Sequence, residues 1–177
     1  ALRIAYPHVQ FENPIAGVAV PGADQLMVVE YSGKIWLIRE DRQSEEKRLV
    51  IDLGTKTVGL ALHPKFAENG RMFVMTIDDQ RPEEVGSRVS EFSVRDGQAD
   101  KTREIPIIEW KRGGHNGGCL GFGPEGYLYI SAGDGSGIAD ELQTGQDVTD
   151  LLGCIMRVDI DNPDDGLNYG IPESNPF

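Results

Sequence analysis

The residues best suited to chemistry in this sequence are a histidine and an aspartate. His115 lies inside the run Gly113–Gly118, and Asp134 follows nineteen positions later in a second glycine-rich run, Ala132–Gly135. Glycine has no Cβ atom, so we expect the backbone beside His115 to approach a ligand closely. A carboxylate beside an imidazole fixes which ring nitrogen carries the proton and makes the other nitrogen more basic. The pattern predicts a general base; the alternative is a surface-loop histidine beside a tight turn.

The charge balance excludes several classes of partner. The 177-residue chain, enough for one domain, has 17 Lys and Arg against 29 Asp and Glu, a net charge of −12. Nucleic acids and anionic membrane surfaces require clustered basic side chains, so we expect neither as a partner. Apolar runs such as Tyr127–Ile130 are far too short to cross a bilayer. No signal peptide begins at Ala1, so the residues alone indicate a cytoplasmic chain or one already processed.

The chain repeats one short phrase three times, at 17–29, 59–75 and 118–130. In each copy an apolar run ends at a proline, and a second apolar run follows a polar or glycine-containing corner. Proline at a strand end supplies no donor to the ladder and fixes φ. No long helix is predicted, and Ala139–Thr149 is expected to be a loop. Further strands are predicted at Lys34–Arg39, Lys47–Asp52, Arg88–Arg95, Thr102–Trp110 and Ile155–Ile160, with a hairpin turn at Asp96-Gly97.

This organisation predicts an all-β fold of the β-propeller type. Four short strands per unit of roughly 40–60 residues are typical of propeller blades. A β-sandwich is the alternative, but it would not restart the same phrase. We expect four-stranded blade-like repeats at about 12–56, 57–112 and 113–161, and a linker toward the next blade at 162–177. About three blades cannot close a ring, so an incomplete propeller is expected, within a longer protein or with a partner.

Several motifs, in their order and spacing, resemble the glucose/sorbosone dehydrogenase family. They are His115–Gly118, Phe122–Ile130, Gly133–Gly135, Leu151–Gly153, Arg157–Asp159 and Ile171–Phe177, with Leu62–Pro64 and Asn69–Val74 earlier in the chain. The resemblance runs from about Phe11 to Phe177 and covers roughly the N-terminal half of the family's domain.

The resemblance implies a six-bladed propeller that oxidises an aldose sugar at C1 with pyrroloquinoline quinone (PQQ) and calcium. It implies that His115 is the catalytic base and Asp134 its acidic partner, facing the propeller hub within bonding distance of each other. A periplasmic or secreted location is implied in the same way. So are further propeller blades and an electron-accepting domain downstream.

Three neighbours of His115 are further pocket candidates. Arg112 precedes the glycine run and is expected to face the same pocket, with a solvated loop charge as the alternative. Asn116 is expected to bond substrate or to occupy a left-handed turn position, which asparagine tolerates. Gly117 is included with them because it lies in the same run.

Two departures limit what the resemblance implies for the cofactors. The family often carries a glutamine in the loop before the second blade, and Leu53–Val58 contains none. The family's calcium ligands and quinone-binding Arg-Asn element are expected beyond Phe177, so the metal ligands stay unassigned. We therefore expect this chain alone to hold neither cofactor well and to be inactive. A non-catalytic propeller module that binds protein or carbohydrate is the alternative function.

Other residues with chemical potential have plainer interpretations. Asp159–Gly166 is rich in oxygen ligands for calcium, but Pro163 stands where a calcium-binding EF-hand loop needs a ligand, so a solvated turn is favoured. Trp36 and Trp110 could stack on sugar rings, although their strand positions favour packing between blades. His63 is expected to be structural.

The two cysteines, Cys119 and Cys154, both lie in apolar strand-like stretches. The favoured interpretation is two buried free thiols, with a disulfide or a metal pair as the alternative.

Overall fold

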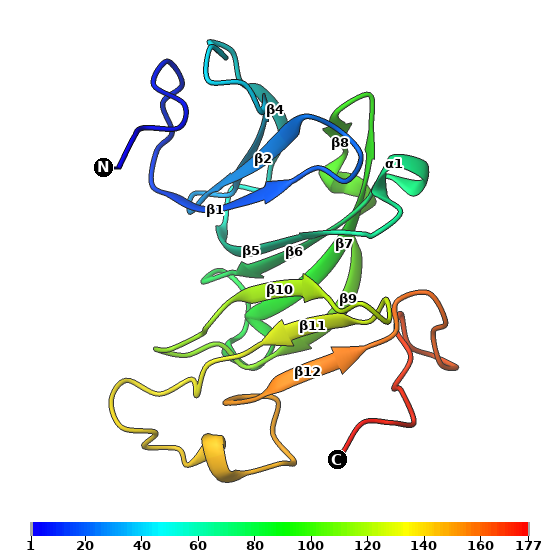
Figure 1. Cartoon of the computed structure of the whole chain (residues 1–177). Coiled ribbons are helices and arrows are strands. Elements are labelled where there is room, and N and C mark those ends of the chain that lie inside the picture. Colours follow the sequence, from blue (N-terminus) through cyan, green and yellow to red (C-terminus); the bar gives the residue numbers. More distant parts are fainter. Residues whose placement is uncertain (1, 177) are drawn as a thin grey trace.

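The computed structural model describes residues 2–176, and nearly all of its regular structure is β (Figure 1). Three antiparallel sheets stack one on the next. The first contains β1 (Pro14–Ala19), β2 (Gln25–Glu30), β3 (Lys34–Arg39) and β4 (Arg48–Asp52). The second contains β5 (Lys56–Leu62), β6 (Arg71–Ile77), β7 (Ser87–Arg95), β8 (Gln98–Ala99) and β9 (Ile105–Trp110). The third contains β10 (Cys119–Phe122), β11 (Leu128–Ser131) and β12 (Ile155–Val158).

Helical structure in residues 2–176 is confined to short turns, so the prediction of an all-β chain is confirmed. It comprises α1 (Phe66–Asn69) and the 3-10 turns Glu83–Val85, Lys101–Arg103 and Thr144–Gln146. None of these helices is long and apolar enough to cross a membrane. The turn at Lys101–Arg103 makes the last strand of the second sheet shorter than predicted, because Asp100 caps it by accepting the Thr102 N–H.

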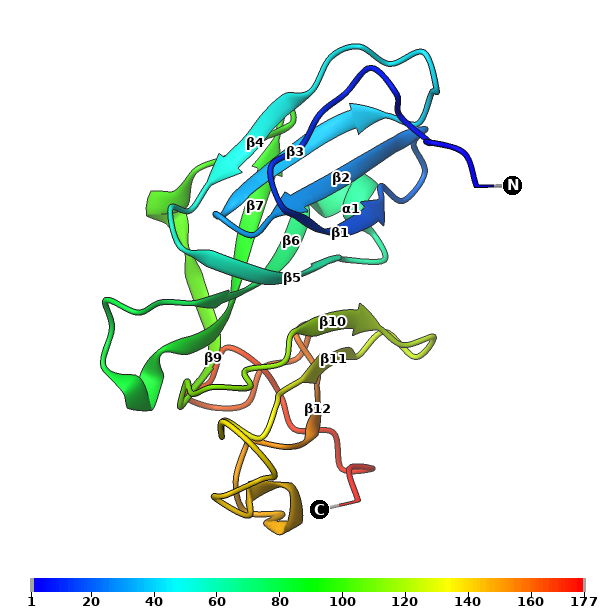
Figure 2. The same ribbon diagram turned by 90° about the vertical axis from the view of Figure 1, so that its left-hand side faces the viewer.

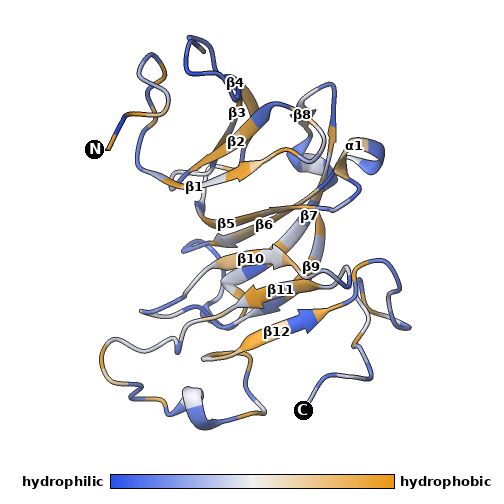
Figure 3. Ribbon diagram, viewed as in Figure 1, coloured by the Kyte–Doolittle hydropathy of each residue, from blue (hydrophilic) through white to orange (hydrophobic). Residues whose placement is uncertain are grey.

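The second sheet is buried on both faces, and strand β6 shows why. Its side chains alternate: Met72 and Val74 pack toward the first sheet, whereas Phe73 and Met75 pack toward the third. All four are fully buried. A strand covered on both faces has no solvent side, so it needs an unbroken apolar run, as the sequence here provides. Figure 3 shows the resulting apolar strands within polar loops.

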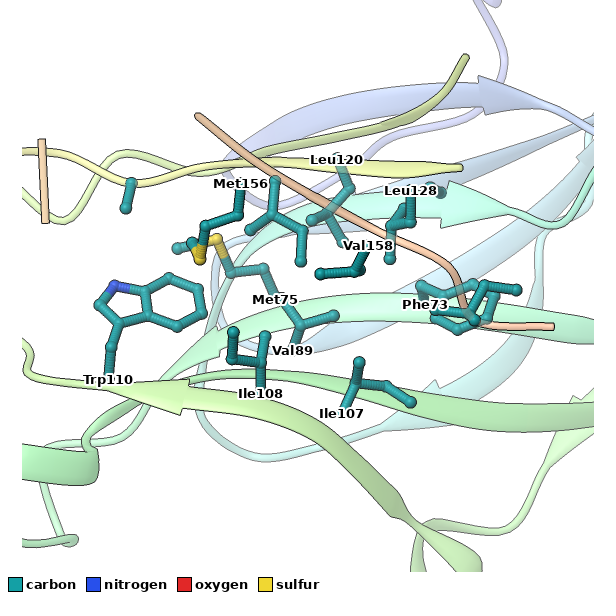
Figure 4. Packing of buried hydrophobic residues seen from close by; sticks show 14 of the residues in the cluster. Phe73, Met75, Val89, Ile107, Ile108, Trp110, Leu120, Leu128, Met156 and Val158 are labelled. Carbon is teal, nitrogen blue, oxygen red and sulfur yellow. The ribbon is translucent and has the colours of Figure 1, made fainter. Parts of the chain in front are cut away.

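The core between the second and third sheets is shown in Figure 4. Met75, Val89 and Ile108 point toward Leu120 and its neighbours on the third sheet. The same cluster contains Trp110, which confirms its predicted packing between sheets.

Trp36 differs from this prediction. It alternates with Ile35 and Leu37, which face the second sheet, so its ring lies on the opposite face of β3. There it is covered by the Lys47 ammonium, 4.1 Å from the ring centre.

The cysteines are both free, as expected, but Cys119 is exposed instead of buried. The reason is the strand alternation of β10, which turns Leu120 into the core and Cys119 to the opposite face. Cys154 is partly buried and packs against the core, and this burial, with a smaller effect of Asp150, raises the pKa of its thiol.

The stacking gathers one set of loops at one end of the molecule. Strands β1, β5 and β10 lie beside one another and run in the same direction (Figure 1). The loops that precede β5 and β10, and those that follow β6 and β11, therefore meet at one end, which faces the viewer in Figure 2. These loops are 53–55, 111–118, 78–86 and 132–154.

A polar network joins the second sheet to the segment after β12. The Arg71 guanidinium donates to both carboxylate oxygens of Glu91, at 2.9 and 2.8 Å, and to the Ile160 carbonyl at 2.8 Å. Arg71 also pairs with Asp161, which His63 contacts through Nε2 at 3.3 Å. The His63 side chain is buried, consistent with the structural role expected for it.

We expect Arg71→Met to lower the free energy of unfolding by about 2–4 kcal/mol, because it leaves Glu91 partly buried and unpaired. Urea denaturation measures the loss. The control is Arg103→Met, whose side chain is 84% exposed and lies 3.7 Å from Asp100; we expect a change below about 0.5 kcal/mol there. Equal losses in the two variants would contradict the role assigned to this network.

Candidate active site

The glycine run before β10 lies along the loop after β11, backbone against backbone. Gly114 N–H donates to the Gly135 carbonyl at 3.0 Å, and Gly135 N–H donates back to the His115 carbonyl at 3.0 Å. In the same ladder, the His115 N–H donates to the Ser136 carbonyl at 2.9 Å, and the Gly133 N–H donates to the Asn116 carbonyl at 3.1 Å. These bonds bring His115 beside Asp134, although nineteen positions separate the two residues in sequence.

The glycines allow this contact between two backbones. A Cβ atom at Gly113 would lie 1.8 Å from the Gly135 carbonyl oxygen, and one at Gly133 would lie 2.2 Å from the His115 carbonyl oxygen. The sequence analysis expected the glycine run to admit a ligand. In the structure, the chain's own loop 133–137 is what approaches these glycines closely.

The side chains of His115 and Asp134 are in direct contact. Nδ1 of His115 lies 3.2 Å from Oδ1 of Asp134. An ionised carboxylate only accepts hydrogen bonds, so this contact favours the neutral tautomer that has its proton on Nδ1 and a lone pair on Nε2. The His115 side chain is 59% exposed and that of Asp134 is 22% exposed. The imidazole is therefore largely open to solvent, whereas the carboxylate is mostly covered.

Asp134 is held by more than the imidazole. Ser136 donates its backbone N–H to Oδ1 at 3.1 Å and its hydroxyl to Oδ2 at 2.9 Å. Partial desolvation alone would raise the pKa of Asp134, but the two donors from Ser136 and the neighbouring His115 outweigh it, and the pKa is lowered. The carboxylate is therefore ionised at neutral pH and ready to stabilise an imidazolium.

The other predicted pocket residues hold the loops. The Asn116 side chain accepts the Gly113 N–H and donates to the Gly113 carbonyl, both at 2.8 Å, which closes a tight turn. Gly117 has φ of 70° and packs against the Gly133 backbone. No hydrogen bond joins Asn116 to the side chains of His115 or Asp134 within residues 2–176.

Arg112 lies across the loop between β6 and β7. Its side chain packs on Gly86, and Nη1 is 3.8 Å from Oδ1 of Asp79, which Lys56 also pairs with. Its Nε is buried and has no hydrogen-bond partner among the described residues. The Arg112 side chain is 27% exposed, so its guanidinium is a partly open cation beside this loop.

Sequence reasoning missed Ser136 and Thr144. The Thr144 hydroxyl donates to the Asp134 carbonyl at 2.7 Å. The spacing Asp134-x-Ser136 is a signal that could have been used, because aspartate commonly accepts the N–H two residues later. Nothing comparable marks Thr144, which lies ten residues further along.

The described residues offer no evident metal centre. Residues 2–176 contain no group of three or more His, Cys, Asp or Glu side chains that could hold an ion. In the acidic segment after β12, Asp159 accepts the N–H groups of Asp161 and Asn162 at 2.9 and 3.1 Å. The segment is thus a hydrogen-bonded turn, the interpretation favoured from the sequence.

Comparisons with known proteins point to one family. The family profile described as Glucose / Sorbosone dehydrogenase matches residues 11–177. The chain is 30% identical to the HIPL2 protein of Arabidopsis thaliana, in an alignment that covers 88% of this chain and 32% of that protein. It is 34% identical to the Hedgehog-interacting protein of Homo sapiens, over 67% of this chain and 18% of that protein.

Solved structures share the fold. The PQQ-bound aldose sugar dehydrogenase of Streptomyces coelicolor superimposes with a TM-score of 0.72 at 20% identity, covering 95% of this chain and 52% of that chain. A glucose dehydrogenase-type oxidoreductase of Thermus thermophilus gives 0.73 at 23% identity, covering 100% and 50%. The chain thus spans about half the length of these structures. The predicted fold class, an incomplete β-propeller, is confirmed.

We expect Gly113→Ala to lower the free energy of unfolding by at least about 2 kcal/mol, because the new Cβ would force the glycine run away from loop 133–137. The His115–Asp134 contact should be lost with it. Urea denaturation and the NMR signals of His115 test both effects. Gly121→Ala is the matched control: a Cβ there meets nothing within 4 Å, so we expect a change within about 0.5 kcal/mol.

The lowered pKa of Asp134 predicts a pH dependence of stability. A folded-state pKa below the unfolded value of about 3.8 contributes stability that is fully present above that value. The contribution disappears as the pH falls through the lower, folded-state pKa. Asp134→Asn should therefore lower the free energy of unfolding at pH 7, and this loss should shrink as the pH falls below about 3.8. Urea denaturation between about pH 7 and 2.5 measures this, with Asp165→Asn in an exposed turn as the charge-matched control.

Proposed function

Because the chain belongs to the glucose/sorbosone dehydrogenase family, we propose that it is part of a quinoprotein that oxidises an aldose sugar at C1. The single observation that carries the proposal is the His115–Asp134 pair, in which Nδ1 lies 3.2 Å from Oδ1. This contact leaves Nε2 as a basic atom on a side chain that is 59% exposed at the loop end of the molecule. A reactant can reach that atom without any rearrangement of the pair.

His115 and Asp134 have different roles in the transfer of one proton. Nε2 of His115 accepts the proton of the C1 hydroxyl, so that the C1–H bond can break with its electron pair. Bound PQQ supplies the acceptor for that hydride. The Asp134 carboxylate stabilises the imidazolium that forms and keeps the ring oriented, without taking the proton itself.

The chain offers cationic groups toward a carboxylated quinone. We propose that Arg112 holds a carboxylate with its guanidinium, which is partly exposed. Lys56, in the same ion-pair group, stands in the stretch that lacks the family's glutamine. Calcium takes part in no step assigned to these residues.

The whole protein supplies what this chain lacks. A groove of about 820 Å³ on the outer side of the third sheet is lined by Ile155 of β12, 71% exposed, and by Ile171 of the segment after β12, 58% exposed. Exposed apolar side chains of this kind fit a further sheet stacked on the third, as the third stacks on the second. We propose further blades at this face, an electron-accepting domain beyond them, and a periplasmic or secreted location.

A second candidate function is a non-catalytic binding module. Two observations favour it: the relatives include a protein named for interacting with Hedgehog, and Leu53–Val58 lacks the glutamine expected near the quinone. In that case the propeller skeleton would present its loops to a protein or carbohydrate without redox chemistry.

The deciding experiment is dye reduction by the whole protein with PQQ, calcium and a panel of aldoses. If the dehydrogenase proposal holds, His115→Ala should lower kcat by about 10²–10⁴-fold, the usual contribution of a positioned base. His8→Ala, in the exposed N-terminal segment, is the matched control and should keep full activity. No sugar-dependent reduction, with quinone binding absent by calorimetry, would favour the binding module.

A further inference from the structure

We propose that Ser136 is a positioning residue for the His115–Asp134 pair, fixing the carboxylate so that the imidazole keeps its proton on Nδ1. The proposal rests on the function proposed for the pair, but its test does not require activity. Ser136 is the one described residue that hydrogen-bonds both members.

Three hydrogen bonds place Ser136 between the two residues. Its carbonyl accepts the His115 N–H at 2.9 Å, which fixes the backbone that carries the ring. Its own N–H reaches Oδ1 of Asp134 at 3.1 Å, and its hydroxyl reaches Oδ2 at 2.9 Å. Oδ1 of Asp134 therefore contacts both His115 and the Ser136 N–H, whereas the Ser136 hydroxyl is the one described partner of Oδ2.

Burial makes the hydroxyl important. Ser136 is only 5% exposed, so water cannot freely replace its bond to the carboxylate. The last torsion of an aspartate side chain is broad, so a carboxylate bonded at one oxygen only can rotate over a wider range than one bonded at both. Without the hydroxyl, Oδ2 keeps no side-chain partner among the described residues, and the carboxylate can turn away from Nδ1.

The loop that carries Ser136 is anchored on its other side by Thr144, which is 7% exposed. The Thr144 hydroxyl donates to the Asp134 carbonyl and lies 3.3 Å from Oδ1 of Asp140. This anchor holds the backbone of Asp134, so a change at the Ser136 side chain should affect the carboxylate more than the loop.

The test is NMR of the 177-residue chain labelled with ¹⁵N-histidine and ¹³C-aspartate, without quinone or sugar. In the wild type, we expect neutral His115 to be mainly the Nδ1–H tautomer. In Ser136→Ala, the ratio of Nδ1–H to Nε2–H should fall by about twofold to tenfold, the range expected for one hydrogen bond. The pKa of Asp134 should rise toward its ordinary value, since the ionised form loses a donor.

Ser136→Thr keeps a hydroxyl and should restore both signals. Ser131→Ala is the matched control: it also removes one serine hydroxyl bond, to Cys119 N–H at 2.9 Å, but does not touch the pair. If Ser136→Ala does not give a native-like spectrum, Ser136→Cys keeps the side-chain size with a much weaker donor.

An unchanged tautomer ratio and Asp134 pKa in a folded Ser136→Ala or Ser136→Cys variant would overturn the proposal, even if the variant were less stable. A shifted tautomer in a protein without dehydrogenase activity would leave the positioning role standing and refute only the proposed reaction.

Discussion

The structure depends on the burial of one sheet between two others. Each side of β6 contributes fully buried side chains, Met72 and Val74 to one core and Phe73 and Met75 to the other. This arrangement fixes how the first and third sheets stack, and therefore makes β1, β5 and β10 run alongside one another in one direction. The loops at their starting ends must then converge. Hydrophobic packing of the sheets thus determines where the loops that carry the candidate active site lie.

At the loop end of the molecule, the His115–Asp134 contact requires two backbone segments to lie very close together. The run around His115 and the loop around Asp134 approach so closely that a Cβ at Gly113 or Gly133 would clash with a carbonyl oxygen. The pair is positioned by main-chain hydrogen bonds between these segments, with Asn116 closing the turn. Backbone contacts of this kind are rigid because no side-chain rotamer is involved. The glycines therefore serve the geometry of the pair.

Sequence could predict what depends on local pattern. Alternation and proline turns indicated the strands, and the family resemblance joined His115 to Asp134, which the structure places 3.2 Å apart. What it could not predict depends on which segment packs where. The exposure of Cys119 and the position of Trp36 follow from which face of a strand meets a neighbouring sheet. The spacing Asp134-x-Ser136 does predict the bond from the Ser136 N–H, but the hydroxyl bond to Oδ2 depends on a side-chain orientation that only the structure shows.

Stability and chemistry are separated in this chain. The ion pair between Arg71 and Glu91 on neighbouring strands of the second sheet is mostly buried, with side chains 22% and 13% exposed. The pair at the loop end is far more open, with His115 59% exposed. An exposed pair contributes little to stability because water competes for both partners. A gain in stability therefore does not explain why glycines, a buried serine and an anchoring threonine surround the His115–Asp134 pair. Keeping one nitrogen of an accessible imidazole free of hydrogen-bond partners within the described residues explains the same set of contacts directly.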